Sequence, residues 1–445
     1  MIKNKVILLL IVLISTVTYA QIVDIPDSVF KDNLVNQPVV DTDNDGIGDT
    51  DADINNDGEI QVSEAEAVIG LHPVFGAINS FEGLQSFINI EVFECSWDPI
   101  TSIDVSTLTN LRELLLEENQ LLNLDISHNT QLEYLNCNNN SLTTLDLSEN
   151  INLKTLFLQN NDLIEIDVTN NANLEILAIS NNDISTINLN QNSNLISLGI
   201  SGNPIDIINV SSNFLLEELR CGYTSISTLE LLNNVNLKQL HFNNNNLSAI
   251  NLTNNVLLEF ISFNNNQFIE IDISSLVNLK YFQSWKNQLV GLDFSSNPLM
   301  KTIYIVDNNL TSLNLKNGNN SQLSNFNAFD NENLYCIEVD DPSQAPYVGW
   351  NTDYQVIYSE DCSLGIEEFL ETQISLYPNP TKGFIHIESN NTINSIKVFD
   401  VLGKLVFQEN NHVNQLDISS LDKGLFFVKI ETDQGISTQK VIKQI

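Results

Sequence analysis

The sequence predicts a repeat solenoid, a stack of 21-residue coils with parallel β-strands on the concave face, followed by a small β-sandwich tail. Three observations predict it. Apolar residues recur every 21 positions, each period contains a short apolar and polar alternation, and the composition changes near residue 375. A chain of 445 residues is too long for one comfortable hydrophobic core, whereas a stack grows by adding coils.

The period runs through eleven successive coils without an insertion or deletion, and a twelfth coil is displaced by two residues. The opening residues are Ile90, Leu111, Leu132, Leu153, Leu174, Leu195, Leu216, Leu237, Leu258, Leu279, Met300 and, for the displaced coil, Leu323. Periods of this length indicate units that bury their apolar sides against one another. One coil alone cannot bury enough apolar surface to fold, so stacking must supply the rest.

Within a coil, the alternation Leu135-x-Cys137 is typical of a short strand. The equivalent strand of the next coil should lie about 4.8 Å away and run parallel to it. Leu142, Leu145 and Leu147 continue the apolar columns after the strand. The columns therefore predict one continuous apolar interior lined by parallel strands.

A second column carries asparagine at the ninth position of the coil. An amide has two donors and an acceptor, so at a buried bend it can bond backbone groups of its own coil and the next. Asp98 and Thr224 interrupt this column, and we expect an end effect at Asp98 and a weakened bend at Thr224. The column consists of Asn119, Asn140, Asn161, Asn182, Asn203, Asn245, Asn266, Asn287, Asn308 and Asn331.

These columns resemble the leucine-rich repeat pattern L-x-x-L-x-L-x-x-N-x-L-x-x-L-x-L over roughly residues 69–340. The 21-residue length with cysteine in the strand is similar to the internalin-like bacterial class. The resemblance implies a curved solenoid with extended or 3₁₀ segments opposite the strands.

The formal charge of −39 arises from 18 Lys and Arg against 57 Asp and Glu. This balance excludes the basic surface that a nucleic-acid-binding protein needs, and it disfavours anionic lipid surfaces. Cations remain favourable partners. The last 71 residues carry as many lysines as acidic residues, so the negative charge lies before them, which marks a domain boundary.

Five segments follow from these patterns. Lys3 and Lys5 precede an apolar run that is too short to span a bilayer, and Ala20 ends a small-residue site, so residues 1–20 predict a cleavable signal peptide. No later stretch predicts a membrane span. The remaining segments are an N-terminal cap (21–89), the repeat array (90–340), a C-terminal cap and linker (341–374) and the tail (375–445).

An acidic segment in the predicted N-terminal cap matches the EF-hand calcium loop at every ligand position. Gly58 permits the sharp turn, and a helix-favouring run follows. The predicted Ca²⁺ ligands are Asp53, Asn55, Asp57, Glu59, Gln61 and Glu64. An upstream segment begins in the same way but has Ala52 at its twelfth position, so a second site at Asp41, Asp43 and Asp45 stays open. For either segment the alternative is a solvated acidic turn.

The cysteines fall into two groups. Cys95, Cys137 and Cys221 occupy one inward strand position, and coils two apart are too distant for a disulfide, so these should be core thiols. Cys336 and Cys362 lie outside that column at the end of the array. In an exported chain they predict a disulfide, with two free thiols as the alternative.

The tail alternates apolar and polar residues in short runs separated by Pro and Gly, which predicts an antiparallel β-sandwich. Its motifs begin at Leu376 (LYPNP), Val398 (VFDVLGK) and Lys423 (KGLFFVK). They resemble the type IX secretion (Por) type A sorting domain of Bacteroidota. The resemblance implies export to the cell surface or beyond through the type IX machinery, followed by tail removal; a functional β-sandwich domain is the alternative.

Alternation along the strands also identifies the solvent-facing residues. Aromatic residues on successive coils predict a ligand patch formed by Phe260, Tyr281, Trp285 and Tyr304, with ring packing between coils as the alternative. Scattered histidines and the absence of phosphate-loop and G-x-S-x-G motifs disfavour an enzyme. The sequence therefore predicts a surface protein that binds an extracellular protein or glycan, in adhesion. A structural surface component and an accessory or inhibitor of a secreted enzyme remain alternatives.

Overall fold

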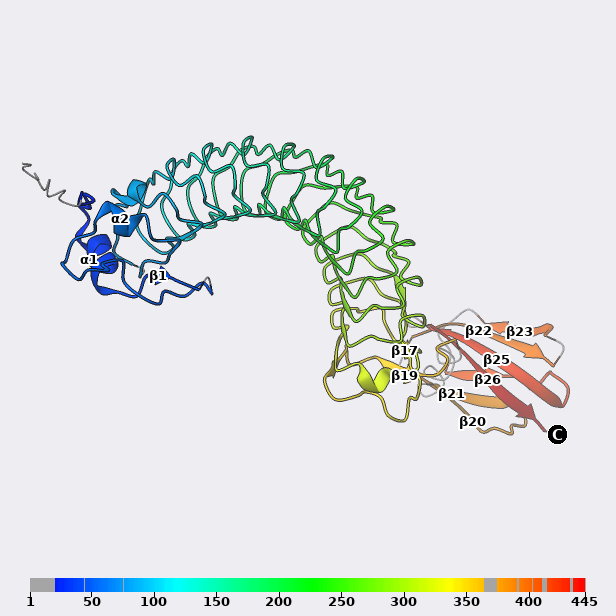
Figure 1. Ribbon diagram of the computed structural model, residues 1–445. Helices are drawn as coiled ribbons and strands as arrows, with labels where there is room; N and C mark the ends of the chain where they lie inside the picture. Colours follow the sequence, from blue (N-terminus) through cyan, green and yellow to red (C-terminus); the bar gives the residue numbers. More distant parts are fainter. Residues whose placement is uncertain are drawn as a thin grey trace, which may run out of the picture. The chain divides into compact units, whose positions relative to one another are not determined.

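The computed structural model describes residues 21–43, 45–74, 76–363, 374–389, 392–401, 403–409, 414–432 and 435–444. The predicted signal peptide, residues 1–20, lies outside the described residues, as do residues 364–373 of the predicted linker. The chain divides into two compact units, residues 1–287 and 288–445 (Figure 1).

The first unit begins with a cap. Helix α1 (Ser28–Asn36) starts at Asp27, whose carboxylate accepts hydrogen bonds from the first helical N–H groups. Strand β1 (Val40–Asp41) pairs antiparallel with β2 (Gly70–Leu71), and β2 pairs in parallel with the first strand of the array. The cap also contains the short helix α2 (Val62–Ala65) and the 3₁₀ turn η1 (Leu84–Ser86).

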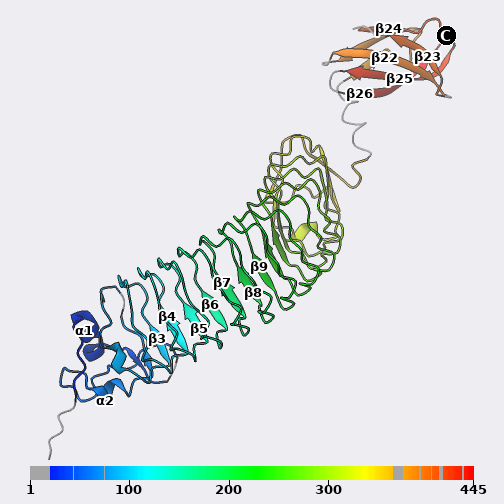
Figure 2. The ribbon, with the colours of Figure 1, turned by 90° about the horizontal axis from the view of Figure 1, so that it is seen from above.

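Ten coils of the first unit each contribute a three-residue strand to one parallel sheet. The strands pair in sequence order with an offset of 21 residues, so Leu135 lies between Leu114 and Leu156, and all three are fully buried. They line the inner side of the curve that these coils form (Figures 1 and 2). The strands are β3 (Val92–Glu94), β4 (Glu113–Leu115), β5 (Tyr134–Asn136), β6 (Thr155–Phe157), β7 (Ile176–Ala178), β8 (Ser197–Gly199), β9 (Glu218–Arg220), β10 (Gln239–His241), β11 (Phe260–Ser262) and β12 (Tyr281–Gln283).

The ninth-position asparagines join consecutive coils. Asn161 Nδ2 donates to the carbonyl of Cys137 in the preceding coil at 2.9 Å and to that of Leu158 in its own coil at 3.2 Å. Its Oδ1 accepts from Leu142 N at 3.0 Å. The amide therefore satisfies buried backbone groups at the bend where no strand pairing can do so.

The two interruptions of this column differ in kind. Asp98 Oδ1 accepts three hydrogen bonds of 2.8–2.9 Å from the N–H groups of residues 76, 77 and 78 in the cap. A carboxylate suits this position because all three partners are donors. Thr224 Oγ1 contacts Cys221 O and Asn245 Oδ1, at 3.1 and 2.6 Å, and within the described residues it makes no bond to the preceding coil.

A second buried asparagine column lies between the outer segments and the next strand. Asn171 Nδ2 donates to Leu147 O and Asn150 O of the preceding coil at 3.1 and 2.9 Å. Each member has an exposed fraction of 0%. The column comprises Asn129, Asn150, Asn171, Asn192, Asn213, Asn234 and Asn255.

The second unit begins with the last coils. Strands β14 (Thr302–Tyr304), β16 (Asn325–Asn327) and β18 (Trp350–Asn351) are neighbours in parallel. A further parallel sheet contains β13 (Gly291–Asp293), β15 (Ser312–Asn314), β17 (Cys336–Glu338) and β19 (Ile357–Ser359), and η2 (Asn320–Gln322) lies between coils. Although the sequence loses its period after residue 340, the predicted cap segment thus adds one more coil.

Trp350 closes the end of this stack. Its Nε1 donates to Leu323 O at 3.0 Å, and its ring contacts Phe326, Tyr347 and Tyr358 with centroid separations of 4.9–5.9 Å. These rings cover the apolar edge that the last coil would otherwise expose.

The tail is an antiparallel β-sandwich, as predicted. Apolar residues from both sheets form one buried core, including Ile385, Val398 and Val428, which are fully buried. One sheet has the order β20 (Ile374–Tyr377), β21 (Phe384–Ser389), β24 (Gln415–Asp417). The other has the order β23 (Leu405–Glu409), β22 (Ile393–Asp400), β25 (Gly424–Thr432), β26 (Gly435–Lys443).

Candidate functional site

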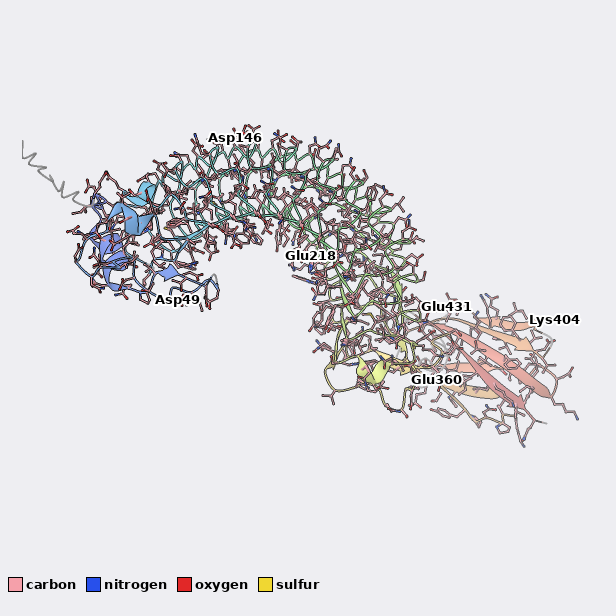
Figure 3. All side chains as sticks on the ribbon, viewed as in Figure 1. Asp49, Asp146, Glu218, Glu360, Lys404 and Glu431 are labelled. Atoms are coloured by element: carbon pink, nitrogen blue, oxygen red, sulfur yellow. A yellow bond between two sulfur atoms is a disulfide. The ribbon has the colours of Figure 1, made fainter. Side chains whose placement is uncertain are left out.

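The solvent-facing side chains of β3–β12 form one surface, which we call the strand face. Figure 3 shows Glu218 on this inner side of the first unit and Asp146 on the opposite, outer side. Because the apolar interior fixes only every second strand residue, the outward residues are free to vary from coil to coil. The strand face therefore divides into segments of different chemistry.

The aromatic segment of the strand face covers residues 216–286. The His241 and Phe260 rings stack at a centroid distance of 4.5 Å and an angle of 26°, and Phe260 lies 5.9 Å from Tyr281 at 32°. In-register pairing of β10, β11 and β12 places these three residues on adjacent strands. The rings therefore present mainly their edges to solvent, because their faces meet along the stack.

Trp285 follows β12 and is 39% exposed, with Lys286 Nζ 5.6 Å from its ring centroid. The structure thus brings Phe260 and Tyr281 into contact and places Trp285 just beyond the same strand as Tyr281. Tyr304, the fourth residue of the predicted patch, is the last residue of β14 in the second unit and is half-buried.

The eighth position of the coil adds exposed aromatic side chains in a costly backbone conformation. Trp97 and Tyr223 have φ of 65° and 54° and exposed fractions of 58% and 68%. The same position holds Asn139, Asn160 and Asn181, whose residue type tolerates a left-handed backbone better. Aromatic residues therefore occupy this position despite its backbone preference, which favours a role for their rings on the strand face.

His241 remains neutral on this surface at physiological pH. Burial of the imidazole, together with the neighbouring Arg220 guanidinium, lowers the pKa of His241 to about 4. A neutral ring stacks on Phe260 without the cost of burying a charge.

The acidic segment of the strand face covers residues 90–160. At its outward positions, six acidic residues oppose two basic ones: Glu91, Glu94, Glu113, Glu117, Glu118 and Glu133 against Arg112 and Lys154. Glu133 bridges both basic residues, at 2.6 Å from Arg112 and 2.5 Å from Lys154. The equivalent positions of the aromatic segment hold three acidic and four basic residues: Glu217, Glu218 and Glu259 against Arg220, Lys238, Lys280 and Lys286.

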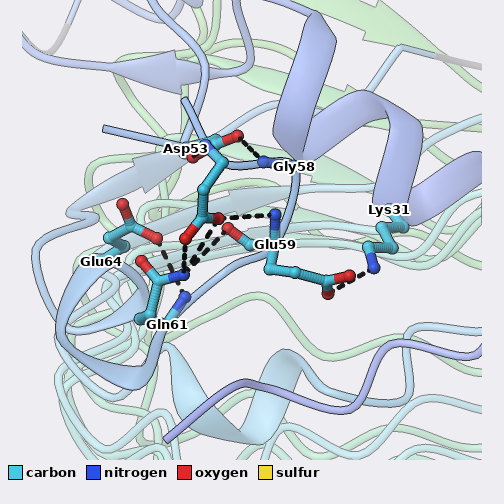
Figure 4. Close-up of polar contacts among 7 residues, drawn as sticks. Lys31, Asp53, Gly58, Glu59, Gln61 and Glu64 are labelled. Carbon is cyan, nitrogen blue, oxygen red and sulfur yellow. Dashed lines mark hydrogen bonds and ion pairs between the residues drawn. The ribbon is translucent and has the colours of Figure 1, made fainter. Parts of the chain in front are cut away.

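The predicted calcium loop, residues 53–64, adopts a closed turn in the cap (Figure 4). Asp53 Oδ2 accepts from Gly58 N at 2.8 Å, and Gly58 has φ of 84°. Glu64 accepts from Asn55 N and Gln61 N at 3.1 and 2.9 Å. The carboxylates of the first and last loop positions thus both turn inward.

The remaining predicted ligands surround the same turn. Gln61 Nε2 donates to Asp57 Oδ1 and Oδ2 at 3.2 and 3.1 Å, and Asn55 Nδ2 donates to Gln61 Oε1 at 2.5 Å. Glu59, whose carbonyl was the predicted ligand, directs its carboxylate to Lys31 at 2.5 Å.

The residues present fit a hard divalent cation. Asp53 and Glu64 are only 2% and 6% exposed. Both carboxylates accept hydrogen bonds from backbone N–H groups, and within the described residues neither forms an ion pair with a cationic side chain. Buried carboxylates favour a compensating positive charge, and their oxygens, together with amide and carbonyl oxygens, form the donor set that Ca²⁺ prefers.

The upstream acidic segment brings together a different set from the one expected. Oxygen atoms of Asp41, Asp43 and Asp49 lie within 4.8 Å of one another, whereas Asp45 is not in this group. Asp45 Oδ1 instead accepts from Ile47 N at 2.9 Å. Asp49 stands nine positions into the segment, the position of Gln61 in the second loop, so its spacing could have identified it from sequence.

Cys336 and Cys362 form a disulfide with a Cα–Cα distance of 5.7 Å, which ties β17 to the segment after β19. The other three cysteines are buried free thiols. Burial raises the pKa of Cys221 to about 12 and shifts the pKa of Cys137 still further upward. Such thiols are poor nucleophiles and serve as apolar core residues.

Among the described residues, no helix is long and apolar enough to cross a membrane.

Comparison with known proteins identifies both parts of the chain. Residues 375–444 match the family model of the secretion system C-terminal sorting domain. The solved structures that resemble this chain include the functional domain of the internalin InlJ from Listeria monocytogenes (20% identity, 96% of this chain and 99% of that chain, TM-score 0.56). They also include the internalin InlF from the same species (18% identity, 76% and 99%, TM-score 0.62).

A leucine-rich-repeat protein of Leptospira interrogans, LIC12759, is similar as well (20% identity, 64% and 83%, TM-score 0.51). No protein in the curated comparison set matches this chain. At these identities the structural likeness establishes the leucine-rich-repeat fold. The protein is an exported leucine-rich-repeat protein, and its tail directs it through the type IX secretion system of a Bacteroidota-type bacterium to the cell surface or beyond.

Proposed function

We propose that this protein is a non-catalytic adhesion or recognition protein that binds an extracellular protein through the aromatic segment of its strand face. The observation that carries the proposal is the stack of His241, Phe260 and Tyr281 beside the exposed Trp285. Exposed aromatic side chains grouped on a rigid surface are typical anchors of protein interfaces.

The orientation of the rings favours a protein partner over a glycan. Aromatic platforms for sugars offer a free ring face, but His241 covers one face of Phe260 at 4.5 Å and Tyr281 lies against the other side. The Lys286 ammonium likewise lies over the ring of Trp285, 5.6 Å from its centroid. Ring edges instead suit contact with apolar side chains of a protein partner.

An array of purified extracellular proteins and purified glycans, probed with the full-length protein, tests this function. We expect saturable binding to one or more proteins and none to the glycans. Saturable binding to glycans alone would contradict the proposed partner class. Binding to neither class would contradict the recognition function and favour a structural surface component.

We also propose that residues 53–64 bind Ca²⁺ and thereby rigidify the cap. Support comes from the buried carboxylates of Asp53 and Glu64 and from the attachment of the loop to the chain start, where Val23 N donates to Ile60 O and Val62 N to Gln21 O, both at 2.8 Å. The ion would supply a positive charge between side chains that this sequence otherwise keeps close together. Extracellular sites of this type bind Ca²⁺ at about 10⁻⁴ to 10⁻³ M.

Calorimetry of the full-length protein with calcium, together with a melting curve, tests this site. We expect heat of binding and a higher melting temperature, both lost in Asp53→Asn with Glu64→Gln. Glu66→Gln, an exposed change beside the loop, is the matched control. If Asp41→Asn with Asp49→Asn abolishes the heat instead, the upstream segment is the site and residues 53–64 are not.

The tail is proposed to be removed after export. Deleting residues 375–445 should trap the remaining protein in the periplasm, as followed by cell fractionation. Delivery of the truncated protein to the surface would assign the tail a different role.

A further inference from the structure

An exposed apolar ridge runs along the first unit, outside the strand face, where the last two positions of each coil precede the next strand. Its six members are 40–53% exposed: Phe214, Leu215, Val235, Val256, Leu257 and Val277. Strand pairing in register from β9 to β12 places them on consecutive coils. The two preceding coils carry Ala172 and Ser193 in the same column, so these residues separate the ridge from the exposed Ile151 one coil further back.

Two of these residues replace an asparagine that serves the stack. At the last position of their coils, Asn194, Asn236 and Asn278 donate to the carbonyl of the preceding coil at 3.2, 2.9 and 2.9 Å. Leu215 and Leu257 occupy this position in the intervening coils and cannot make that bond. Exposed leucines in place of a bonding amide give up a hydrogen bond and leave apolar surface in water, so the ridge is a candidate contact surface.

A row of alternating charges runs beside the ridge, two or three residues further along the chain. Beside the ridge its order is Glu217, Lys238, Glu259, Lys280, and the same column alternates in earlier coils as Glu91, Arg112, Glu133, Lys154, Glu175. Ile196 separates the two stretches, so the part beside the ridge consists of the first four residues named. Lys238 pairs with Glu217 at 2.7 Å and Lys280 with Glu259 at 2.6 Å, while the four side chains stay 28–47% exposed. These four residues carry no net charge although the chain carries −39.

We propose that a second copy of this chain covers the ridge, in an antiparallel two-fold dimer. When the row meets itself in reverse order, Glu217 faces the partner's Lys280 and Lys238 faces the partner's Glu259, so every charge meets its opposite. The same rotation places Phe214 against the partner's Val277 and Val235 against the partner's Val256. In a parallel arrangement with the two rows facing each other, each charged residue would face its own copy, and like charges would repel.

The charge distribution favours this occupant over an unrelated protein. Two copies of a strongly acidic chain repel each other, and the repulsion is smallest where the local charges cancel. An isologous interface must also be self-complementary, and the four charges beside the ridge satisfy this when their order is reversed. A ridge of four coils is short, so the dimer belongs to the weak class with an interface below about 1,200 Å².

Sedimentation velocity of the full-length protein at concentrations up to about 100 μM, the range for a weak interface, tests the dimer. We expect a concentration-dependent shift from monomer to dimer that Phe214→Ser with Val256→Ser abolishes. A protein that stays monomeric at the highest concentration, or a dimer that survives this pair of changes, would overturn the proposal.

Charge exchange tests the geometry without changing composition. Exchanging one pair, Glu259→Lys with Lys280→Glu, keeps the ion pair within the chain but places like charges against each other in the dimer, so it should abolish association. Exchanging the other pair, Glu217→Lys with Lys238→Glu, should do the same.

The two exchanged proteins should associate when mixed, and the protein with all four changes should dimerise again. These results require the antiparallel register. Dimerisation that is insensitive to either exchange, or a mixture that stays monomeric while the original protein dimerises, would overturn it. Circular dichroism verifies that each variant is folded.

Discussion

The acidic and aromatic segments of the strand face share one scaffold but differ in chemistry. Leu135 in the first and Leu240 in the second are equally buried and lie in the same column. The outward residues change from excess carboxylates to stacked rings with balanced charge. This difference indicates that the inward residues and the asparagine column determine the fold, which leaves the outward residues free to carry the recognition proposed above.

The scaffold should respond alike in both segments when the asparagine column is broken. Asn161→Ala and Asn266→Ala each leave one buried N–H, that of Leu142 or Leu247, without its acceptor. Each change also removes one of the two amide donors at two buried carbonyls. We expect each change to lower the free energy of unfolding by about 3 kcal/mol. Denaturant unfolding measures this, and a cost confined to one segment would contradict a shared scaffold.

Thr224 lies in the aromatic segment and interrupts the column. Thr224→Asn should restore a hydrogen bond from this position to a carbonyl of the preceding coil. The model for this bond is the one that Asn203, one coil earlier, makes to Ile179 O at 2.9 Å. We expect the free energy of unfolding to rise by about 1 kcal/mol. Thr224→Val, which removes the hydroxyl but keeps the volume, is the control and should not stabilise the protein.

A pH dependence of stability belongs to the aromatic segment. The pKa of His241 in the folded protein, about 4, lies below that of an unfolded histidine near 6.5, so protons bind preferentially to the unfolded chain. Stability from this group is therefore present above about pH 6.5 and declines as the pH falls toward 4.

His241→Phe should flatten that part of the stability profile, measured by thermal melting from pH 7 to pH 4. His128→Phe changes an exposed histidine in the other segment and serves as the control. An unchanged slope in His241→Phe would show that other groups control this pH range.

Much of the fold could be predicted from the sequence because each coil repeats the same apolar and asparagine positions. The column through Leu135 predicts the strand in each coil, and the column through Asn161 predicts the bend. The extra coil at Trp350 could not be predicted, because it is held by an aromatic cluster and an indole hydrogen bond to Leu323 O rather than by the repeat. The role of Asp98 likewise depends on cap N–H groups that no period specifies.

The candidate site was only partly predictable. Phe260, Tyr281 and Trp285 follow from strand alternation, but the stacking of His241 on Phe260 depends on ring angles that a sequence does not contain. Asp49 was not predicted because Ala52 breaks the calcium-loop pattern at its twelfth position, and without that pattern no residue type specifies the ninth position. The ridge was missed because its residues lie between the columns that define the repeat.

The most direct test of recognition by the aromatic segment compares binding of two variants to a protein that the array identifies, by surface plasmon resonance. Phe260→Ser, Tyr281→Ser and Trp285→Ser together should weaken binding at least about 30-fold, equivalent to about 2 kcal/mol, the usual threshold for anchor residues. Glu113→Gln, Glu117→Gln and Glu118→Gln in the acidic segment should change it by less than about 5-fold, as expected for peripheral charges. Equal binding by the original protein and the triple serine variant, with both folded, would contradict the account.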